Sequence, residues 1–210
     1  MKVTVTISRK KVLTNKRGKS LVMVSGGLDS VAALVWLLEN TDDLIHVHHV
    51  RLFNYEDRST PEYEAYKNCM KYIEENYRPL HLVTESVVSW PEPFCPWDMY
   101  SYMFQGALLI NCYNPGFNPT RIVTGSIDEE DPNTNVHVRR GVSWEMFKLL
   151  CEHAVEWYKP LLHMKKPEVA AILPDELRRM TFSCRSPIVE DGIYRSCGEC
   201  RPCWARRKED

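Results

Sequence analysis

The chain has no long apolar run, no excess of charge of either sign and no internal repeat. No apolar stretch approaches the ~18 residues that a membrane-spanning helix needs, so we expect no membrane partner. The 27 Lys and Arg residues are balanced by 28 Asp and Glu residues. The absence of a basic field disfavours a long nucleic-acid duplex as the partner, although it leaves a substrate on a nucleic acid or a protein open.

The N-terminus lacks the features of a secretion signal. Residues 1–11 alternate apolar and polar side chains, without an apolar core region and without a small-residue cleavage site. This pattern predicts an edge strand that runs into a basic turn, and it favours a cytoplasmic protein. The cytoplasm is reducing, so the spacing of the eight cysteines favours metal binding over disulfides.

The length and the apolar content suit one sizeable α/β domain with a small appendage. The chain has 210 residues, of which 44% are hydrophobic. We expect strands at residues 21–24, 44–50, 80–83 and 121–124, and helices at residues 29–40, 61–77, 100–112, 143–157 and 166–173. This alternation predicts a Rossmann-like parallel sheet with helices on both faces and ligands at the carboxyl ends of its strands.

The segment from about residue 181 differs from the rest, because it is rich in cysteine and poor in periodic apolar residues. We therefore expect two units. Residues 1–180 form a nucleotide-binding α/β domain, and residues 181–210 form a metal-binding module.

The sequence SGGLDS at residues 25–30 joins the first predicted strand to the first predicted helix. Such a turn exposes backbone N–H groups at a helix N-terminus, where they can hold a phosphate. Gly26 and Gly27 let the backbone approach the anion closely, and the two serines can add hydroxyl donors. Asp29 would repel a bare phosphate, so we expect it to shape the loop or to hold Mg²⁺. The turn lacks the GK[ST] of the Walker pattern and is not GxGxxG.

This stretch resembles the signature of the PP-loop ATP pyrophosphatases. These enzymes split ATP between the α- and β-phosphates and adenylylate an oxygen of their substrate. The resemblance implies that the loop binds ATP and Mg²⁺. The alternative is an ordinary turn between a strand and a helix.

Four cysteines near the C-terminus have the spacing of metal ligands. They are Cys184, Cys197, Cys200 and Cys203. Four thiolates suit tetrahedral Zn²⁺, whose closed Cys₄ sites are usually structural. An iron–sulfur cluster is the competitor, although no cysteine after Cys203 completes the ferredoxin pattern. The neighbouring arginines, Arg195, Arg201, Arg206 and Arg207, would offset the thiolate charge and can also face an anionic ligand.

The two motifs together resemble the 7-cyano-7-deazaguanine synthases, the QueC family. That family has a similar TWSC followed by CGxCxxC, which match residues 181–184 and 197–203. Residues 160–169 look like its PLIHxxKxEI segment, which implies that Lys166 binds phosphate. The alternative for Lys166 is a solvated lysine at a helix start. The resemblance thus implies nucleotide binding by Ser25, Gly26, Gly27, Leu28, Asp29, Ser30 and Lys166, with Asp29 and Lys166 as the catalytic pair.

Three loops depart from the family pattern. The family's DYGQ element, its PxRN motif and its GxHxED loop correspond here to residues 53–58, 94–100 and 125–131. The second loop has lost both Arg and Asn, and Asp98 stands where the family has a cation. The substrate residues implied by the resemblance are Phe53, Tyr55, Arg58, Trp97, Asp98, Gly125, Asp128 and Glu129.

The resemblance implies a ligase that uses ATP, Mg²⁺ and Zn²⁺. The carboxylate of 7-carboxy-7-deazaguanine attacks the α-phosphate of ATP, and ammonia converts the acyl-adenylate to an amide. A second activation dehydrates the amide to the nitrile, preQ0. The family is often dimeric, which favours a homodimer.

The departures leave other functions open. The reaction can stop at the amide, or act on a deazaguanine on DNA or a protein in a modification or antiphage-defence pathway. A PP-loop enzyme that modifies tRNA is a second alternative, against which the short length and neutral charge count. A zinc-binding scaffold that only senses nucleotide is a third.

Three histidines lie on the second predicted strand. His46 and His48 share one face of it and suggest a metal pair. Because no third ligand is in view, we favour satisfied core histidines, or a strand end near the nucleotide, over a metal site.

Overall fold

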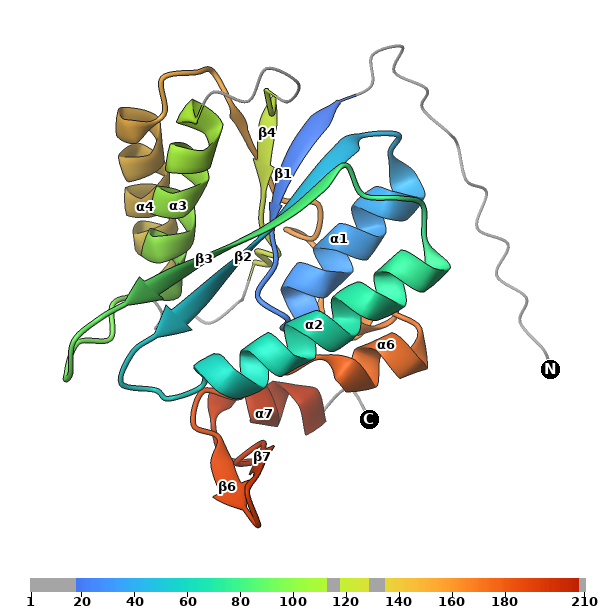
Figure 1. Cartoon of the computed structure of the whole chain (residues 1–210), viewed down its shortest axis with the longest axis vertical. Coiled ribbons are helices and arrows are strands. Elements are labelled where there is room, and N and C mark those ends of the chain that lie inside the picture. Colours follow the sequence, from blue (N-terminus) through green and yellow to red (C-terminus); the bar gives the residue numbers. More distant parts are fainter. Residues whose placement is uncertain (1–17, 113–117, 129–134, 208–210) are drawn as a thin grey trace.

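The core of the protein is a parallel sheet of five strands in the order β3-β2-β1-β4-β5 (Figure 1). The computed structural model describes residues 18–112, 118–128 and 135–207. The strands are β1 (Lys19–Met23), β2 (Leu44–Phe53), β3 (Leu82–Ser89), β4 (Arg121–Val123) and β5 (Glu156–Tyr158). The central strand β1 pairs in parallel with β2 and β4, with Ser20 opposite Ile45 and Arg121. The predicted α/β class is confirmed.

Helices cover both faces of this sheet. They are α1 (Leu28–Asn40), α2 (Ser59–Asn76), α3 (Asp98–Asn111), α4 (Val136–Leu150), α5 (Lys166–Ala170) and α6 (Asp175–Met180). Figure 1 shows α1, α2 and α6 on one face and α3 and α4 on the other. Each face has its own buried apolar cluster, one around Leu34 and Ile73 and one around Met103 and Phe147. Burial of these side chains is the main term that stabilises the two layers.

Two predicted elements differ most from the structure in their bounds. The helix predicted at residues 143–157 begins earlier, at Val136, and ends at Leu150. Cys151 already has an extended backbone, and Trp157 lies in β5, where it pairs with Ile122. The apolar spacing continues past the helix end, which explains the error. The strand predicted at residues 80–83 begins at Leu82 and continues to Ser89, because it pairs with β2 along its length.

The C-terminal segment forms a hairpin and a short helix. Strands β6 (Ile188–Glu190) and β7 (Ile193–Arg195) pair antiparallel, and α7 (Arg201–Arg207) follows. The hairpin turn has positive φ at Asp191 (52°) and Gly192 (76°). An Asp-Gly pair between β-branched residues is a known signal for such a turn, and our sequence analysis did not use it. In the part of the chain that the structure describes, no helix has the length and apolarity for a membrane crossing. The strand predicted within residues 1–11 and the site residue Glu129 lie outside the described residues.

Candidate nucleotide and metal site

The glycine turn joins the end of β1 to the start of α1, at the carboxyl edge of the sheet. Gly26 has φ of +89°, and a Cβ there would lie 2.8 Å from the backbone oxygen of Glu62 and the backbone nitrogen of Tyr66. Glycine is therefore required at position 26 by its conformation and by the close approach of α2. The turn is held against α2, and its N–H groups lie at the N-terminus of α1.

Three backbone N–H groups at this turn donate hydrogen bonds to serine hydroxyl groups. The Ser25 N–H donates to Ser30 Oγ (3.1 Å), and the Gly27 N–H donates to Ser25 Oγ (3.3 Å). The Leu28 N–H donates to Ser183 Oγ (3.3 Å), which comes from the C-terminal segment. Gly27, the N-cap residue of α1, has no side chain to cap the helix. The N-terminus of α1 thus offers weakly bound donors and the positive end of the helix dipole to an anion.

Lys166 and Asp29 form an ion pair beside the turn. Lys166 Nζ lies 2.7 Å from Asp29 Oδ1 and 2.6 Å from Oδ2, and both side chains are about one third exposed. Lys166 is the first residue of α5, and Asp29 lies in the first turn of α1. The structure therefore brings together the two residues that the sequence analysis paired, although they are 137 positions apart.

A cavity of about 180 Å³ opens next to this pair. Three of its lining residues, Leu28, Asp29 and Lys166, belong to α1 and α5. The others come from the C-terminal segment, namely Ser183, Arg201, Pro202, Ala205 and Arg206. A second and larger cavity, of about 350 Å³, lies near Asp128, Arg140 and Trp144.

A cluster of charges lies where β2 ends and α2 and α3 begin. The Arg58 guanidinium contacts the carboxylates of Glu56, Glu62 and Asp98. Arg185 donates to Glu56 Oε1 and to Asp98 Oδ2, each at 2.9 Å. Burial raises the pKa of Glu62 to about 7, although Arg58 opposes this shift. Two predicted substrate residues, Arg58 and Asp98, are thus in contact, and Asp98 Oδ1 is buried with no hydrogen-bond partner among the described residues.

The remaining predicted substrate residues are more scattered. Phe53, the last residue of β2, and Tyr55 are exposed. Trp97 directly precedes α3, with its ring against Tyr100. Gly125 packs on the first turn of α1, since a Cβ there would lie 2.4 Å from the carbonyl of Asp29. Asp128 lies within 3.5 Å of the side chains of Arg140 and His163.

Sequence reasoning missed three residues of this site. Ser183 and Arg185 flank the cysteine Cys184, and their contacts depend on where the C-terminal segment docks on the sheet. Glu62 had a local signal, because it lies four residues after Arg58 at the start of a helix.

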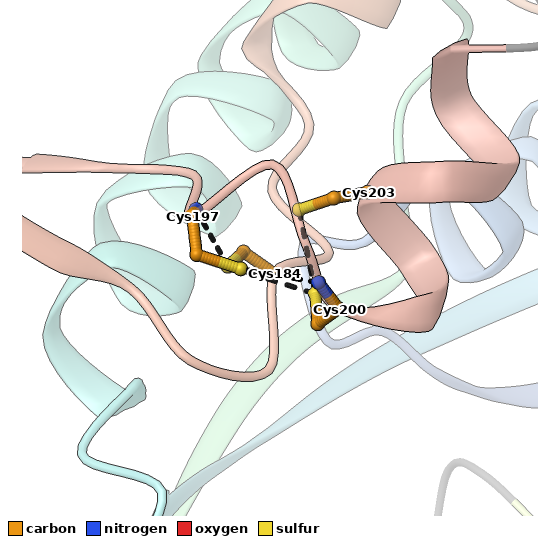
Figure 2. Close-up of side chains that lie close together, drawn as sticks. All are labelled: Cys184, Cys197, Cys200 and Cys203. Atoms are coloured by element: carbon orange, nitrogen blue, oxygen red, sulfur yellow. Dashed lines mark hydrogen bonds between the residues drawn. The ribbon is translucent and has the colours of Figure 1, made fainter.

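The four C-terminal cysteines converge as predicted (Figure 2). All four sulfur atoms lie within 4.8 Å of one another. Cys184 Sγ is 3.5 Å from Cys197 Sγ and 3.8 Å from Cys200 Sγ, which is 3.3 Å from Cys203 Sγ. Four thiolates at ~2.3 Å from one zinc ion would be separated by ~3.8 Å. The donor set and its spacing therefore fit a single tetrahedral ion.

Backbone N–H groups surround these sulfurs. The N–H groups of Cys200 (3.3 Å) and Glu199 (3.4 Å) donate to Cys197 Sγ and lower the pKa of this thiol to about 7. The Arg185 N–H donates to Cys200 Sγ at 3.4 Å. Such donors stabilise thiolates, the form that binds metal. Of the four other cysteines, Cys69 is buried and Cys112 is exposed.

A parallel sheet with this glycine turn and a partner lysine at its rim is the arrangement expected of the PP-loop class of α/β proteins. Residues 19–89, from the first residue of β1 to the last of β3, match the family model described as Queuosine biosynthesis protein QueC. Over this segment the chain is therefore QueC-like, and it is divergent in the loops that follow the strands. The match supports an ATP-using enzyme of the PP-loop class.

Among solved structures, the chain is similar to the U34-tRNA thiolase NcsA from Methanococcus maripaludis with its 4Fe-4S cluster. The TM-score is 0.47 at 15% sequence identity, over 94% of this chain and 65% of that chain. The chain therefore spans less than two thirds of the thiolase. The tRNA substrate and the cluster are properties of that protein.

Proposed function

We propose that this protein adenylylates the carboxylate of 7-carboxy-7-deazaguanine with ATP and converts it with ammonia to the amide or the nitrile. The observation that carries the proposal is the ion pair of Lys166 and Asp29 at the uncapped N-terminus of α1. This arrangement suits ATP, because it offers backbone donors, a lysine and a carboxylate at one point of the sheet rim. The QueC match over residues 19–89 supports the acceptor.

Each partner of the ion pair has its own role when Mg-ATP binds. Carboxylate oxygens are ligands that Mg²⁺ prefers, so Asp29 would hold the ion against the phosphates. Lys166 would then be released to stabilise negative charge on the transferring phosphoryl group. The turn N–H groups would exchange the hydroxyls of Ser25 and Ser183 for phosphate oxygens. The chain itself supplies positioning and charge rather than a covalent nucleophile.

The buried charge cluster is the proposed site for the deazaguanine ring. A guanine-like edge presents N–H donors, and the unpartnered Asp98 Oδ1 is an acceptor within the cluster. The family has a cation at the position of Asp98, and here Arg185 places a guanidinium 2.9 Å from that carboxylate. A second chain segment thus brings a guanidinium to this loop, where it pairs with carboxylates. The acceptor oxygens of the cluster support a guanine-like ring that presents N–H donors.

The four-cysteine site is proposed to hold Zn²⁺. Its sulfur distances suit one ion, whereas a 4Fe–4S cluster binds each thiolate through a different iron atom and needs more room between the sulfurs. A closed Cys₄ zinc site supplies folding energy rather than a reactive position. The four cysteines therefore take no part in the chemical step, and they affect it only by holding neighbouring residues in position.

Product analysis tests the proposed reaction. Purified protein is incubated with 7-carboxy-7-deazaguanine, ATP, Mg²⁺ and ammonium, and the products are identified by mass spectrometry. We expect AMP and pyrophosphate together with the amide or the nitrile. Omission of ammonium should leave the acyl-adenylate or its hydrolysis product. If no AMP forms with the free base, the proposal fails, and a nucleic-acid- or protein-linked acceptor becomes the next candidate.

A further inference from the structure

The metal module and the glycine turn are joined by direct contacts. The Phe182 N–H donates to the Gly26 carbonyl (3.0 Å), and Ser183 Oγ accepts from the Leu28 N–H (3.3 Å). Both residues directly precede the cysteine Cys184. The position of the proposed phosphate-binding loop is thus tied to the position of a metal ligand.

The same module closes the cavity beside Lys166. Arg201 and Pro202, which line it, lie between the ligands Cys200 and Cys203. A volume of about 180 Å³ is below the ~300–1,000 Å³ of pockets for drug-sized ligands, so the cavity suits a small ion rather than a whole nucleotide. Three cationic side chains and one carboxylate line it, namely Lys166, Arg201, Arg206 and Asp29. The lining therefore favours a multiply charged anion.

We propose that Arg201 of the four-cysteine module binds the β- and γ-phosphates of ATP, and pyrophosphate after cleavage. The inference rests on the proposed use of ATP but not on the identity of the acceptor. Arg201 and Lys166 both line the cavity, so the two cations would hold the leaving group together. The planar guanidinium can donate two parallel hydrogen bonds to phosphate oxygens.

Arg206 is a positioning residue in this arrangement. Its guanidinium donates to the carbonyls of Arg178 (2.7 Å) and Thr181 (2.8 Å) at the end of α6. These bonds fix α7 on the α/β domain, while the metal would fix the loop that carries Arg201. The four-cysteine site would thereby hold Arg201 in place at the phosphate site.

Ligand binding to the full-length, zinc-loaded protein tests the assignment. Titration calorimetry with inorganic pyrophosphate and with AMP is compared for wild type, Arg201→Ala and Arg201→Lys. We expect Arg201→Ala to weaken pyrophosphate binding at least about tenfold, since a bidentate charged contact is lost, and Arg201→Lys to recover part of it. AMP lacks the β- and γ-phosphates, so its affinity should not change.

Arg195→Ala is the matched control. Arg195 lies in the same module, more than half exposed, in an ion pair with Glu190, and it does not line the cavity. Zinc content is measured for each variant so that loss of the module is recognised. The proposal is overturned if wild type does not bind pyrophosphate, or if Arg201→Ala retains zinc and binds pyrophosphate as wild type does. Failure of 7-carboxy-7-deazaguanine to react would leave these affinities unchanged, so the two proposals are tested separately.

Discussion

Lys166 Nζ lies between the two carboxylate oxygens of Asp29, at 2.7 Å and 2.6 Å. Each group neutralises the other at the rim of the sheet, where the glycine turn opens. Because both side chains are about one third exposed, the pair contributes little to stability, roughly 1 kcal/mol or less. The small contribution to stability agrees with the proposed role of the pair, in which Asp29 binds Mg²⁺ and Lys166 binds phosphate.

Removal of either charge should abolish AMP formation without unfolding the protein. We expect Asp29→Asn and Lys166→Gln each to lower the rate of ATP cleavage by roughly 10²–10³, the range for loss of one preorganised charge in an active site. The measurement is AMP release by chromatography, with melting temperature as the check on folding. Asp175→Asn, an exposed carboxylate paired with Arg178, should cleave ATP as wild type does. Near-normal AMP release by Asp29→Asn would contradict the assigned role.

The two arginines of the buried cluster should differ in effect. Arg58 is almost fully buried against three carboxylates. Arg58→Met removes the ion pair of the buried Glu62 and leaves Glu56 and Asp98 with Arg185 alone, so it should cost about 3–5 kcal/mol of unfolding free energy. The side chain of Arg185 is 35% exposed, so Arg185→Met should cost roughly 1 kcal/mol or less. Urea denaturation measures both values.

Arg185 should matter more for the acceptor than for the fold. We expect Arg185→Met to raise KM for 7-carboxy-7-deazaguanine, while KM for ATP stays within about twofold, since Arg185 contacts the charge cluster and not the glycine turn. An unchanged KM for the acceptor would remove Arg185 from the proposed pocket.

The histidines of β2 should make the protein sensitive to acid. His48 donates or accepts through both ring nitrogens, with Thr84 Oγ1 at 2.8 Å and Ser86 Oγ at 3.0 Å, and burial lowers its pKa from 6.5 to about 4. The unfolded chain therefore binds a proton between these values that the folded chain does not. Stability is full above pH 6.5 and falls, by on the order of 3 kcal/mol for this residue, as the pH drops to about 4.

A substitution that cannot titrate isolates this effect. Relative to wild type, His48→Gln should show a smaller loss of unfolding free energy between pH 6.5 and pH 4, followed by denaturation at several pH values. His153→Gln, at an exposed position outside the helices and strands, is the control and should retain the wild-type slope. Equal slopes for His48→Gln and wild type would show that this ring is not buried neutral.

Local patterns predicted the parts of the fold that depend on local physics. The glycine turn was predictable because only glycine readily adopts the positive φ seen at Gly26, and the metal cluster was predictable from the spacing of the cysteines. The end of α4 was missed because apolar residues continue into β5, where Trp157 packs on Trp144 from the sheet side. Periodicity in one window does not distinguish a helix from a helix followed by a buried strand.

The charge cluster was less predictable than the glycine turn, because it depends on tertiary contacts rather than on local sequence. Arg58 and Asp98 were singled out separately, but their contact and the arrival of Arg185 depend on how three distant segments dock. The sequence showed the loss of the family's cation from this loop, but it did not show that Arg185 of the C-terminal segment pairs with Asp98 there. Tertiary placement, rather than composition, decides the electrostatics of this cluster.

Metal loss should release the C-terminal module and expose the start of α1. In Cys203→Ser we expect loss of bound zinc, because one of the four ligands is replaced. We also expect loss of hydrogen-exchange protection across α7 and at the Leu28 N–H, which in the wild-type structure donates to Ser183 Oγ. The strands β1 and β2 and the buried part of α1 should stay protected, since their apolar cluster does not include the cysteines of the module. Cys112→Ser, an exposed cysteine outside the cluster, should retain zinc and full protection. If Leu28 keeps its protection in zinc-free Cys203→Ser, then the module does not position the glycine turn, and the coupling between the metal site and the phosphate site is wrong.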